Sequence, residues 1–234
     1  MSFKSRISLT RAPEHAVAVV SGGLDSVVLA HLFESTGARL TLISFNYGQR
    51  HHKELSFATL AADRLKADHH LVDMSSLAQV LSGSALTDLK IEVPDGHYGD
   101  EAMKATVVSN RNAILLSVAT GLAVSIGADA VAIGVHGGDH PIYPDCRPAF
   151  IEAFDHQTRL ANEGFAHPNF RIEAPFMNIT KVDIVRLGAE LGVDFSQTWS
   201  CYKGGDLHCG TCGTCVERRE AFAEAGIVDP TVYI

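Results

Sequence analysis

The chain has 234 residues, of which 46% are hydrophobic and 20% are charged, and this composition excludes a disordered protein. At about 100–200 residues per domain, the length predicts a single domain over residues 1–234. A formal net charge of −8 excludes a protein that coats a nucleic-acid duplex, because phosphate binding requires surplus cations, so we expect no nucleic-acid partner.

The first third of the chain alternates short apolar, β-branched runs with segments of helical period. Strands are expected at residues 15–20, 40–45 and 70–72, and helices at residues 24–35 and 51–66. Strands that alternate with helices are typical of a parallel sheet with helical crossovers. The sequence therefore predicts a Rossmann-like α/β fold.

The rest of the chain continues this alternation around two long segments without helical period. Those segments, residues 82–105 and 136–147, contain glycine and proline, and loops of this length are commonly lids or binding loops. The expected helices are at residues 112–126, 150–161, 181–191 and 216–225, and the expected strands are at residues 130–135 and 170–173.

Neither a targeting segment nor a membrane span is apparent. Residues 1–12 contain cations but no apolar run, so we expect no signal peptide. Residues 112–128 carry no charge, but they include Gly121 and Gly127 and fall short of about 20 apolar residues, which favours a buried helix. Four of the five cysteines lie between residues 201 and 215, unlike a secreted disulfide framework. We expect a cytoplasmic protein without a membrane partner.

The junction between the first strand and the first helix has an unusual composition. It reads Ser21-Gly22-Gly23-Leu24-Asp25-Ser26. Adjacent glycines can turn successive backbone N–H groups toward one point, and the following helix adds the positive end of its dipole. With two serine hydroxyls as further donors, the segment predicts a cradle for a chain of phosphates. The Walker and dinucleotide-binding patterns are absent, and a plain capped turn is the alternative.

The string S-G-G-x-D-S in this strand–loop–helix setting resembles the PP-loop of ATP pyrophosphatases. These enzymes cleave ATP to AMP and pyrophosphate while they activate a carbonyl or carboxyl oxygen. The resemblance implies a parallel sheet of the PP-loop type and an ATP site. The ATP-binding residues that it implies are Val20, Ser21, Gly22, Gly23, Leu24, Asp25, Ser26, Val27, Val28, Leu29 and Ala30.

A second motif lies near the C-terminus. Cys201, Cys209, Cys212 and Cys215 are spaced C-x7-C-x2-C-x2-C. Four thiolates suit tetrahedral Zn²⁺ in a closed, structural site, so we expect a small zinc module at residues 200–216. An iron–sulfur cluster is the rival interpretation, but ferredoxin-type runs place their additional cysteine downstream, whereas here it lies upstream. Four free thiols are the remaining alternative.

Four further strings narrow the resemblance. They are Tyr47-Gly48-Gln49-Arg50-His51, Ser109-Asn110-Arg111-Asn112, Tyr143-Pro144-Asp145-Cys146-Arg147 and Cys209-Gly210-Thr211-Cys212. Together, over about residues 16–223, they are similar to the 7-cyano-7-deazaguanine synthase family of queuosine and related deazapurine pathways. The resemblance implies that 7-carboxy-7-deazaguanine, ammonia and ATP are converted to the nitrile, with one bound zinc and often in a homodimer.

The reaction that the resemblance implies suggests roles for individual residues. Arg50, Arg111 and Lys181 are candidates for contacts with phosphate or carboxylate groups, and Mg²⁺ is expected with ATP. The other expected substrate contacts are Asp145 as acceptor for the pyrimidine edge of the deazaguanine, Tyr47 or Tyr143 stacked on the ring, and Gln49 and Arg147.

The chain departs from the commonest family pattern at three places. Ser109-Asn110 precede Arg111, where many members have a glycine directly before the arginine. Residues 180–183 match the family pattern only at Lys181. Residues 136–140 differ from the acidic, serine-rich sequence that many members have here. These departures indicate a branch of the family rather than a different reaction, and they leave the exact substrate open. The alternatives to this family are another PP-loop ligase, a tRNA-modifying enzyme and a non-catalytic nucleotide-binding relative.

Two features remain open. The pairs His51-His52 and His69-His70 resemble metal ligands, but adjacent residues on a helix face different directions, which favours solvated or capping histidines. Cys146 is a substrate contact, a nucleophile or a passive buried thiol. No amidotransferase domain is visible in the sequence, so we expect ammonia to arrive free or from another chain.

Overall fold

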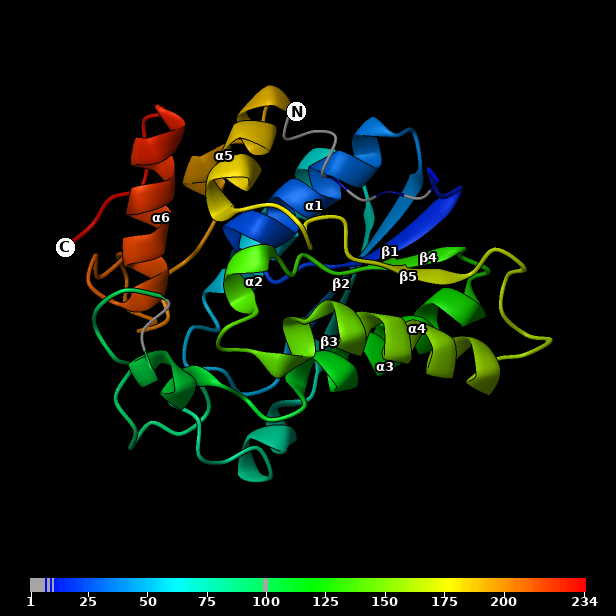
Figure 1. Ribbon diagram of the computed structural model, residues 1–234, viewed down its shortest axis with the longest axis horizontal. Coiled ribbons are helices and arrows are strands. Elements are labelled where there is room, and N and C mark those ends of the chain that lie inside the picture. Colours follow the sequence, from blue (N-terminus) through cyan, green and yellow to red (C-terminus); the bar gives the residue numbers. More distant parts are fainter. Residues whose placement is uncertain (1–6, 8, 10, 99–100) are drawn as a thin grey trace.

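Five parallel strands form one sheet in the order β3-β2-β1-β4-β5 (Figure 1). This computed structural model of the protein describes residues 7, 9, 11–98 and 101–234, so the expectation about residues 1–12 falls largely outside the described residues. The strands are β1 His15–Val19, β2 Arg39–Asn46, β3 Asp68–Asp73, β4 Ala130–Ala132 and β5 Arg171–Glu173. The predicted parallel sheet is confirmed.

Helices cover both faces of the sheet (Figure 1). They are α1 Leu24–Ser35, α2 Glu54–Leu65, α3 Arg111–Ser125, α4 Pro148–Ala161, α5 Lys181–Glu190 and α6 Gly213–Ala225. Residues of α1, α2, α5 and α6 pack with Ala16 and Ala18 on one face, and residues of α3 and α4 pack with Val17 and Val19 on the other. Because β1 is buried on both faces, its sequence is apolar at every position after His15.

Several element boundaries differ from the sequence-based prediction, for local reasons. The helix expected from residue 51 begins at Glu54, because the Gln49 side chain bonds to the backbone of Phe45 and Tyr47 and holds a turn there. The strand expected at residues 130–135 ends at Ala132, where the chain leaves the sheet. The helix expected from residue 216 begins at Gly213, so Cys215 lies in its first turn.

The uncharged segment 112–128 forms most of α3 and is packed in the core, as predicted. None of the helices in residues 7, 9, 11–98 and 101–234 is long and apolar enough to cross a membrane.

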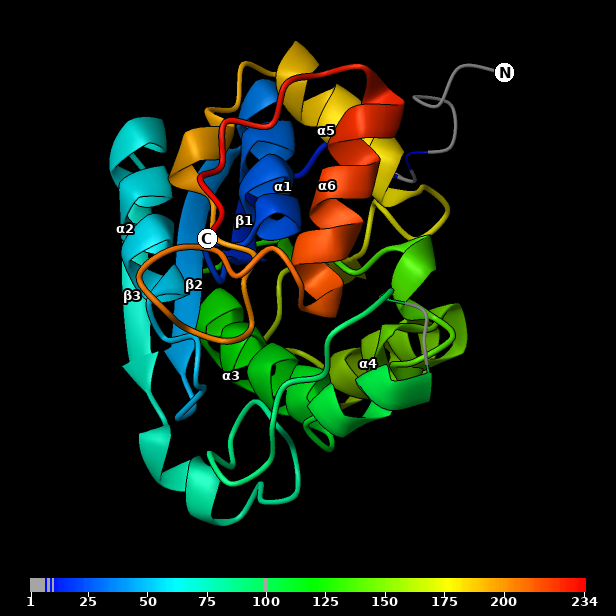
Figure 2. The ribbon, with the colours of Figure 1, turned by 90° about the vertical axis from the view of Figure 1, so that its left-hand side faces the viewer.

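The C-terminal part of the chain closes over the carboxyl ends of the strands. Figure 2 shows the segment that carries the cysteines next to the C-terminus, and Ile234 N donates to the His208 carbonyl at 2.9 Å. The long segment expected at residues 82–105 packs against the same region, since Gly96 N donates to the Thr211 carbonyl at 3.1 Å. Gly99 in that segment lies outside the described residues.

The loop after β1 rests directly on the first turn of α2. Gly22 has φ +93°, and a Cβ there would lie 2.0 Å from the Glu54 carbonyl oxygen and 2.7 Å from Ala58 N. The Gly22 carbonyl accepts a hydrogen bond from Trp199 N at 2.9 Å. Position 22 therefore needs glycine for its backbone conformation and for this close approach.

We predict that Gly22→Ala lowers the free energy of unfolding by at least about 3 kcal/mol, since left-handed strain and a clash with immovable backbone add together. Gly37→Ala is the matched control, because Gly37 has φ +79° and no atom of the part of the chain that the structure describes lies within 4 Å of its Cβ position. That variant should lose only about 1–2 kcal/mol. Urea denaturation measures both, and equal losses would contradict the close-packing explanation.

Candidate active site

The phosphate cradle is organised by its own serines. Ser26 Oγ donates to the Gly23 carbonyl at 3.0 Å, and Gly23 N donates to Ser21 Oγ at 3.1 Å. Among the described residues no side chain caps the N-terminus of α1, so its first N–H groups remain available to a ligand. The loop thus joins free backbone donors to the positive end of a helix dipole, a combination that suits an anion.

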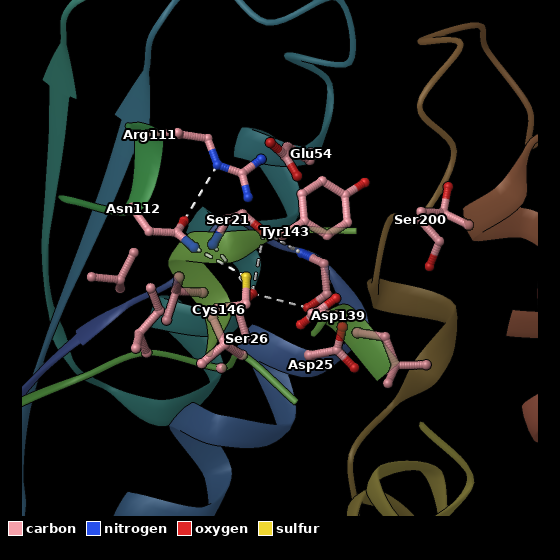
Figure 3. Close-up of a pocket in the computed structure, with 18 of the residues that line it drawn as sticks. Ser21, Asp25, Ser26, Glu54, Arg111, Asn112, Asp139, Tyr143, Cys146 and Ser200 are labelled. Atoms are coloured by element: carbon pink, nitrogen blue, oxygen red, sulfur yellow. Dashed lines mark hydrogen bonds between the residues drawn. The ribbon is translucent and has the colours of Figure 1, made fainter. Parts of the chain in front are cut away.

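A single continuous pocket extends from this loop across the carboxyl ends of β1, β2 and β4 (Figure 3). Ten of the residues singled out in the sequence line it: Val20, Ser21, Gly23, Leu24, Asp25, Ser26, Tyr47, Arg111, Tyr143 and Lys181. Lining residues that sequence reasoning missed include Glu54, Tyr98, Asp139, Trp199 and Tyr202.

The structure places the other predicted ATP-site residues behind the pocket wall. Val27, Val28, Leu29 and Ala30 face the core that α1 shares with β1 and α5. Gly22 supports the loop from below through its contact with α2.

Four other predicted site residues do not line the pocket. Arg50 Nη2 donates to the carbonyls of Asp88 and Ile91 at 3.2 and 2.7 Å. Arg147 Nε donates to the carbonyl of His140 at 2.9 Å.

Gln49 and Asp145 are likewise engaged with neighbouring groups. Gln49 is buried and holds the turn before α2. Asp145 Oδ2 accepts a hydrogen bond from Asn112 N at 3.0 Å and so satisfies a donor in the first turn of α3.

Lys181, the first residue of α5, is clamped between carboxylates of two other helices. Its Nζ lies 2.5 Å from Asp25 Oδ2 and 3.3 Å from Glu217 Oε2. Burial alone lowers the pKa of Lys181, but these carboxylates outweigh it and raise the pKa above its ordinary value. Burial also raises the pKa of Glu217. Lys181 therefore stays charged beside the phosphate cradle.

His136 lies at the centre of the same cluster. Its Nδ1 accepts from Gly138 N at 3.0 Å, so Nε2 carries the proton and faces carboxylate oxygens of Asp25, Asp139 and Glu217 at 3.7–4.0 Å. Burial acts to raise the pKa of Asp139, but the interactions with His136 and Lys181 and the hydrogen bonds from His136 N and the Tyr98 hydroxyl outweigh it and hold the pKa below its ordinary value. Three carboxylates thus gather near one lysine at this end of the pocket.

The opposite end of the pocket is aromatic and contains Arg111. The Arg111 side chain donates from Nε to Asn112 Oδ1 at 3.4 Å and also interacts with the Tyr47 hydroxyl. Burial raises the pKa of Tyr47 to about 12, so its hydroxyl stays protonated. The guanidinium thus lies in the pocket with most of its donors unengaged, as a site for a carboxylate or phosphate requires.

The Ser-Asn string before Arg111 has a structural explanation. Asn110 adopts φ +60° at the N-terminus of α3, in the left-handed region that glycine occupies readily and asparagine tolerates. A glycine at position 110 could adopt this same backbone conformation.

Cys146 also lines the pocket, and Asn112 Nδ2 donates to its Sγ at 3.3 Å. Burial raises the pKa of this thiol, so it is scarcely ionised near neutral pH. This favours a passive thiol over a nucleophile.

The four C-terminal cysteines converge. Their Sγ atoms all lie within 4.8 Å of one another, and Cys212 N donates to Cys209 Sγ at 3.2 Å. This set could hold a metal ion, and four sulfur ligands fit tetrahedral Zn²⁺. Because Thr214 and Arg218 on the same helix as Cys215 line the pocket, the metal module and the pocket share α6.

The Asp25 side chain meets the chemical demand of a divalent cation. Its Oδ1 is buried and hydrogen-bonds to none of the residues that the structure describes. Carboxylate oxygens beside a phosphate site suit Mg²⁺, so the residues present fit the ion expected with ATP.

A parallel sheet with this phosphate loop, a half-buried lysine and an arginine-bearing pocket defines an ATP-using α/β enzyme of the PP-loop type. Residues 15–226 match the family described as Queuosine biosynthesis protein QueC, and the chain belongs to this family.

Curated relatives agree with this membership. The chain is 58% identical to the 7-cyano-7-deazaguanine synthase of Rhizobium johnstonii over 93% of this chain and 91% of that protein. It is 59% identical to the synthase of Paracoccus denitrificans, over 93% and 92% of the two chains. Among solved structures, it is similar to the NMN synthetase of Francisella tularensis, with a TM-score of 0.49 and 16% identity over 92% of this chain and 74% of that one. The family expected from the sequence motifs is confirmed.

We predict that Lys181→Met weakens ATP binding by about 10-fold or more, because Asp25 and Glu217 would then face the phosphates without a counter-charge. Lys203→Met is the matched control, since Lys203 Nζ contacts Asp95 and Thr211 instead. Isothermal titration calorimetry with ATP and Mg²⁺ measures both affinities. An unchanged affinity in Lys181→Met would contradict the assigned role.

We predict that Cys212→Ser lowers the bound zinc from about one ion per chain to a small fraction and also lowers the melting temperature, since metal binding and local folding are coupled. Cys146→Ser should retain the metal, because Cys146 lies outside the cluster. Metal analysis and thermal melting of both variants supply the readouts. Iron in place of zinc, or no metal in the wild type, would contradict a zinc site.

Proposed function

We propose that the protein converts 7-carboxy-7-deazaguanine and ammonia to 7-cyano-7-deazaguanine, with ATP cleaved to AMP and pyrophosphate. One observation carries this proposal: a single pocket joins the phosphate loop to a half-buried arginine among tyrosines. Such a pocket suits a planar acid whose carboxylate must meet the α-phosphorus of ATP. The names of the curated relatives support the same substrate class.

The proposed reaction activates the same carbon twice. A carboxylate oxygen attacks the α-phosphorus and pyrophosphate leaves. Ammonia then attacks the acyl carbon of the resulting adenylate, and AMP and a proton leave to give the primary amide. In the second round the amide oxygen attacks another ATP, pyrophosphate leaves, and loss of AMP and the nitrogen-bound protons forms the nitrile. In both rounds an oxygen bound to the same carbon must lie next to the α-phosphorus of ATP, so one site serves both rounds.

The pocket residues take up complementary roles in this proposal. Ser21, Gly23 and Ser26, with the first N–H groups of α1, hold the departing pyrophosphate. Lys181 offsets the charge that develops there. Arg111 binds the carboxylate and keeps it in line with the α-phosphorus, and Tyr47 and Tyr143 contact the ring.

Two metal ions complete the proposal. Mg²⁺ would be held by Asp25 and Glu217, and it would neutralise phosphate charge when ATP is bound. Zn²⁺ would be held by Cys201, Cys209, Cys212 and Cys215 and would fix the segment that carries Trp199 and the start of α6.

The wider setting of the enzyme is also part of the proposal, with the homodimer taken from the family resemblance and the rest from the sequence. We include in the proposal a homodimer, a cytoplasmic location and ammonia that arrives free or from another chain. The net charge of −8 supports the absence of a nucleic-acid partner.

A turnover assay tests the proposal. The purified protein receives 7-carboxy-7-deazaguanine, ATP, Mg²⁺ and an ammonium salt, and mass spectrometry follows the products. We expect the nitrile together with AMP. If AMP forms without nitrile, the enzyme activates a different carboxylate or amide substrate at the same loop. If a folded, zinc-loaded sample does not cleave ATP, the protein is a non-catalytic nucleotide-binding relative.

A further inference from the structure

The pocket contains several carboxylates, and their hydrogen bonds distinguish them. Asp25 is held by Lys181 at the phosphate end. Asp139 has both oxygens engaged, since Oδ2 accepts from His136 N at 2.9 Å and Oδ1 accepts from the Tyr98 hydroxyl at 3.0 Å. Asp25 therefore lies at the wrong end of the pocket to accept hydrogen bonds from a purine, and Asp139 has no free oxygen with which to do so.

Glu54 is the carboxylate that remains at the aromatic end. Its Oε1 lies 3.3 Å from both Gln49 Nε2 and His51 Nε2. Its Oε2 has no hydrogen-bond partner among the residues that the structure describes, and the side chain lines the pocket. A carboxylate that is only 9% exposed, with one oxygen fixed and the other open, is incomplete without a donor from a ligand.

The surroundings of Glu54 hold it in place. His51 is buried and its ring packs against Tyr202, with 5.0 Å between the ring centroids. Gln49 is anchored to the backbone of Phe45 and Tyr47. The carboxylate is therefore pre-oriented, which lowers the entropic cost of binding a rigid ring.

Glu54 and Arg111 lie at the same end of the pocket, away from Asp25 and Ser26 (Figure 3). Both side chains influence the pKa of Tyr47, which is set first by burial, so both lie near that ring. A donor-rich edge at Glu54 and a carboxylate at Arg111 are the two ends that a 7-carboxy-7-deazaguanine presents.

We propose that Glu54 determines purine specificity: its Oε2 accepts hydrogen bonds from the ring N–H and the 2-amino group of the substrate. This inference rests on the proposed substrate class. It replaces the sequence-based assignment of that role to Asp145, because the Asp145 carboxylate caps α3 and does not line the pocket. Gln49 and His51 act through Glu54 as positioning residues.

The Glu54→Gln variant supplies a directional test. The donors of Gln49 and His51 will hold the new amide oxygen at the former Oε1 position, so the amide N–H₂ takes the former Oε2 position. A donor then faces the 2-amino group of the substrate. An analogue with an oxo group at position 2 offers an acceptor at that point.

The experiment compares the guanine-type acid with its 2-oxo analogue, by kcat/KM for ATP-dependent turnover and by calorimetric affinity without ATP. We expect the wild type to prefer the guanine type, and Glu54→Gln to shift the ratio toward the 2-oxo analogue by about 100-fold or more, with the KM for ATP unchanged. Asp145→Asn is the matched control and should keep the wild-type ratio. Thermal melting checks that both variants fold.

The outcomes separate this inference from the proposed function. An unchanged ratio in a folded Glu54→Gln variant, or a wild type that binds both purines equally, overturns the inference. If the preference between the two purines shifts only in Asp145→Asn, Asp145 and not Glu54 recognises the pyrimidine edge. Selective binding without nitrile formation overturns the proposed function and leaves the recognition intact. If Glu54→Gln does not fold, Glu54→Asp keeps the charge but withdraws it by one methylene, and it should lose selectivity.

Discussion

The close contact between Gly22 and the first turn of α2 is the constraint on which the site depends. A side chain at position 22 would meet the Glu54 carbonyl oxygen at 2.0 Å, and the Gly22 carbonyl accepts a hydrogen bond from Trp199 N. One residue without a side chain therefore joins the phosphate loop to the helix that carries Glu54 and to the segment that leads to the cysteines. Both ends of the pocket are set relative to each other through this junction.

Charge balance is the second organising feature. Three helices and the loop after β4 each contribute one charged or titratable side chain beside the phosphate loop: Lys181, Asp25, Glu217 and His136. The nitrogen atoms of Lys181 and His136 lie 2.5–4.0 Å from the carboxylate oxygens of Asp25 and Glu217. Partial burial reduces the contact of these groups with water, which strengthens their mutual interactions. The cluster keeps a cation where phosphate charge would develop and holds the carboxylates near it in defined positions.

Local sequence determined the parts of this molecule that could be predicted. The Ser21–Ser26 loop and the four cysteines each form one chain segment, so spacing alone indicated their place and their chemistry. Glu54, Tyr202 and Glu217 were missed because tertiary packing, which leaves no local pattern, brings them to the pocket or to the cluster beside it. Asp145 lies in a specific motif, but the sequence does not reveal that its carboxylate satisfies the start of α3.

The placement of pocket residues along the chain has a consequence for biosynthesis. The sheet is complete at Glu173, whereas Lys181, Trp199, Thr214 and Arg218 follow it and still belong to the pocket. Translation at about 5–20 residues per second takes roughly 2–9 s to reach Arg218 after Glu173. During that interval the nascent chain contains the residues of β1 to β5 and of the phosphate loop, but the residues that complete the pocket have not yet been added. The complete pocket can therefore form only when synthesis of the chain is nearly finished.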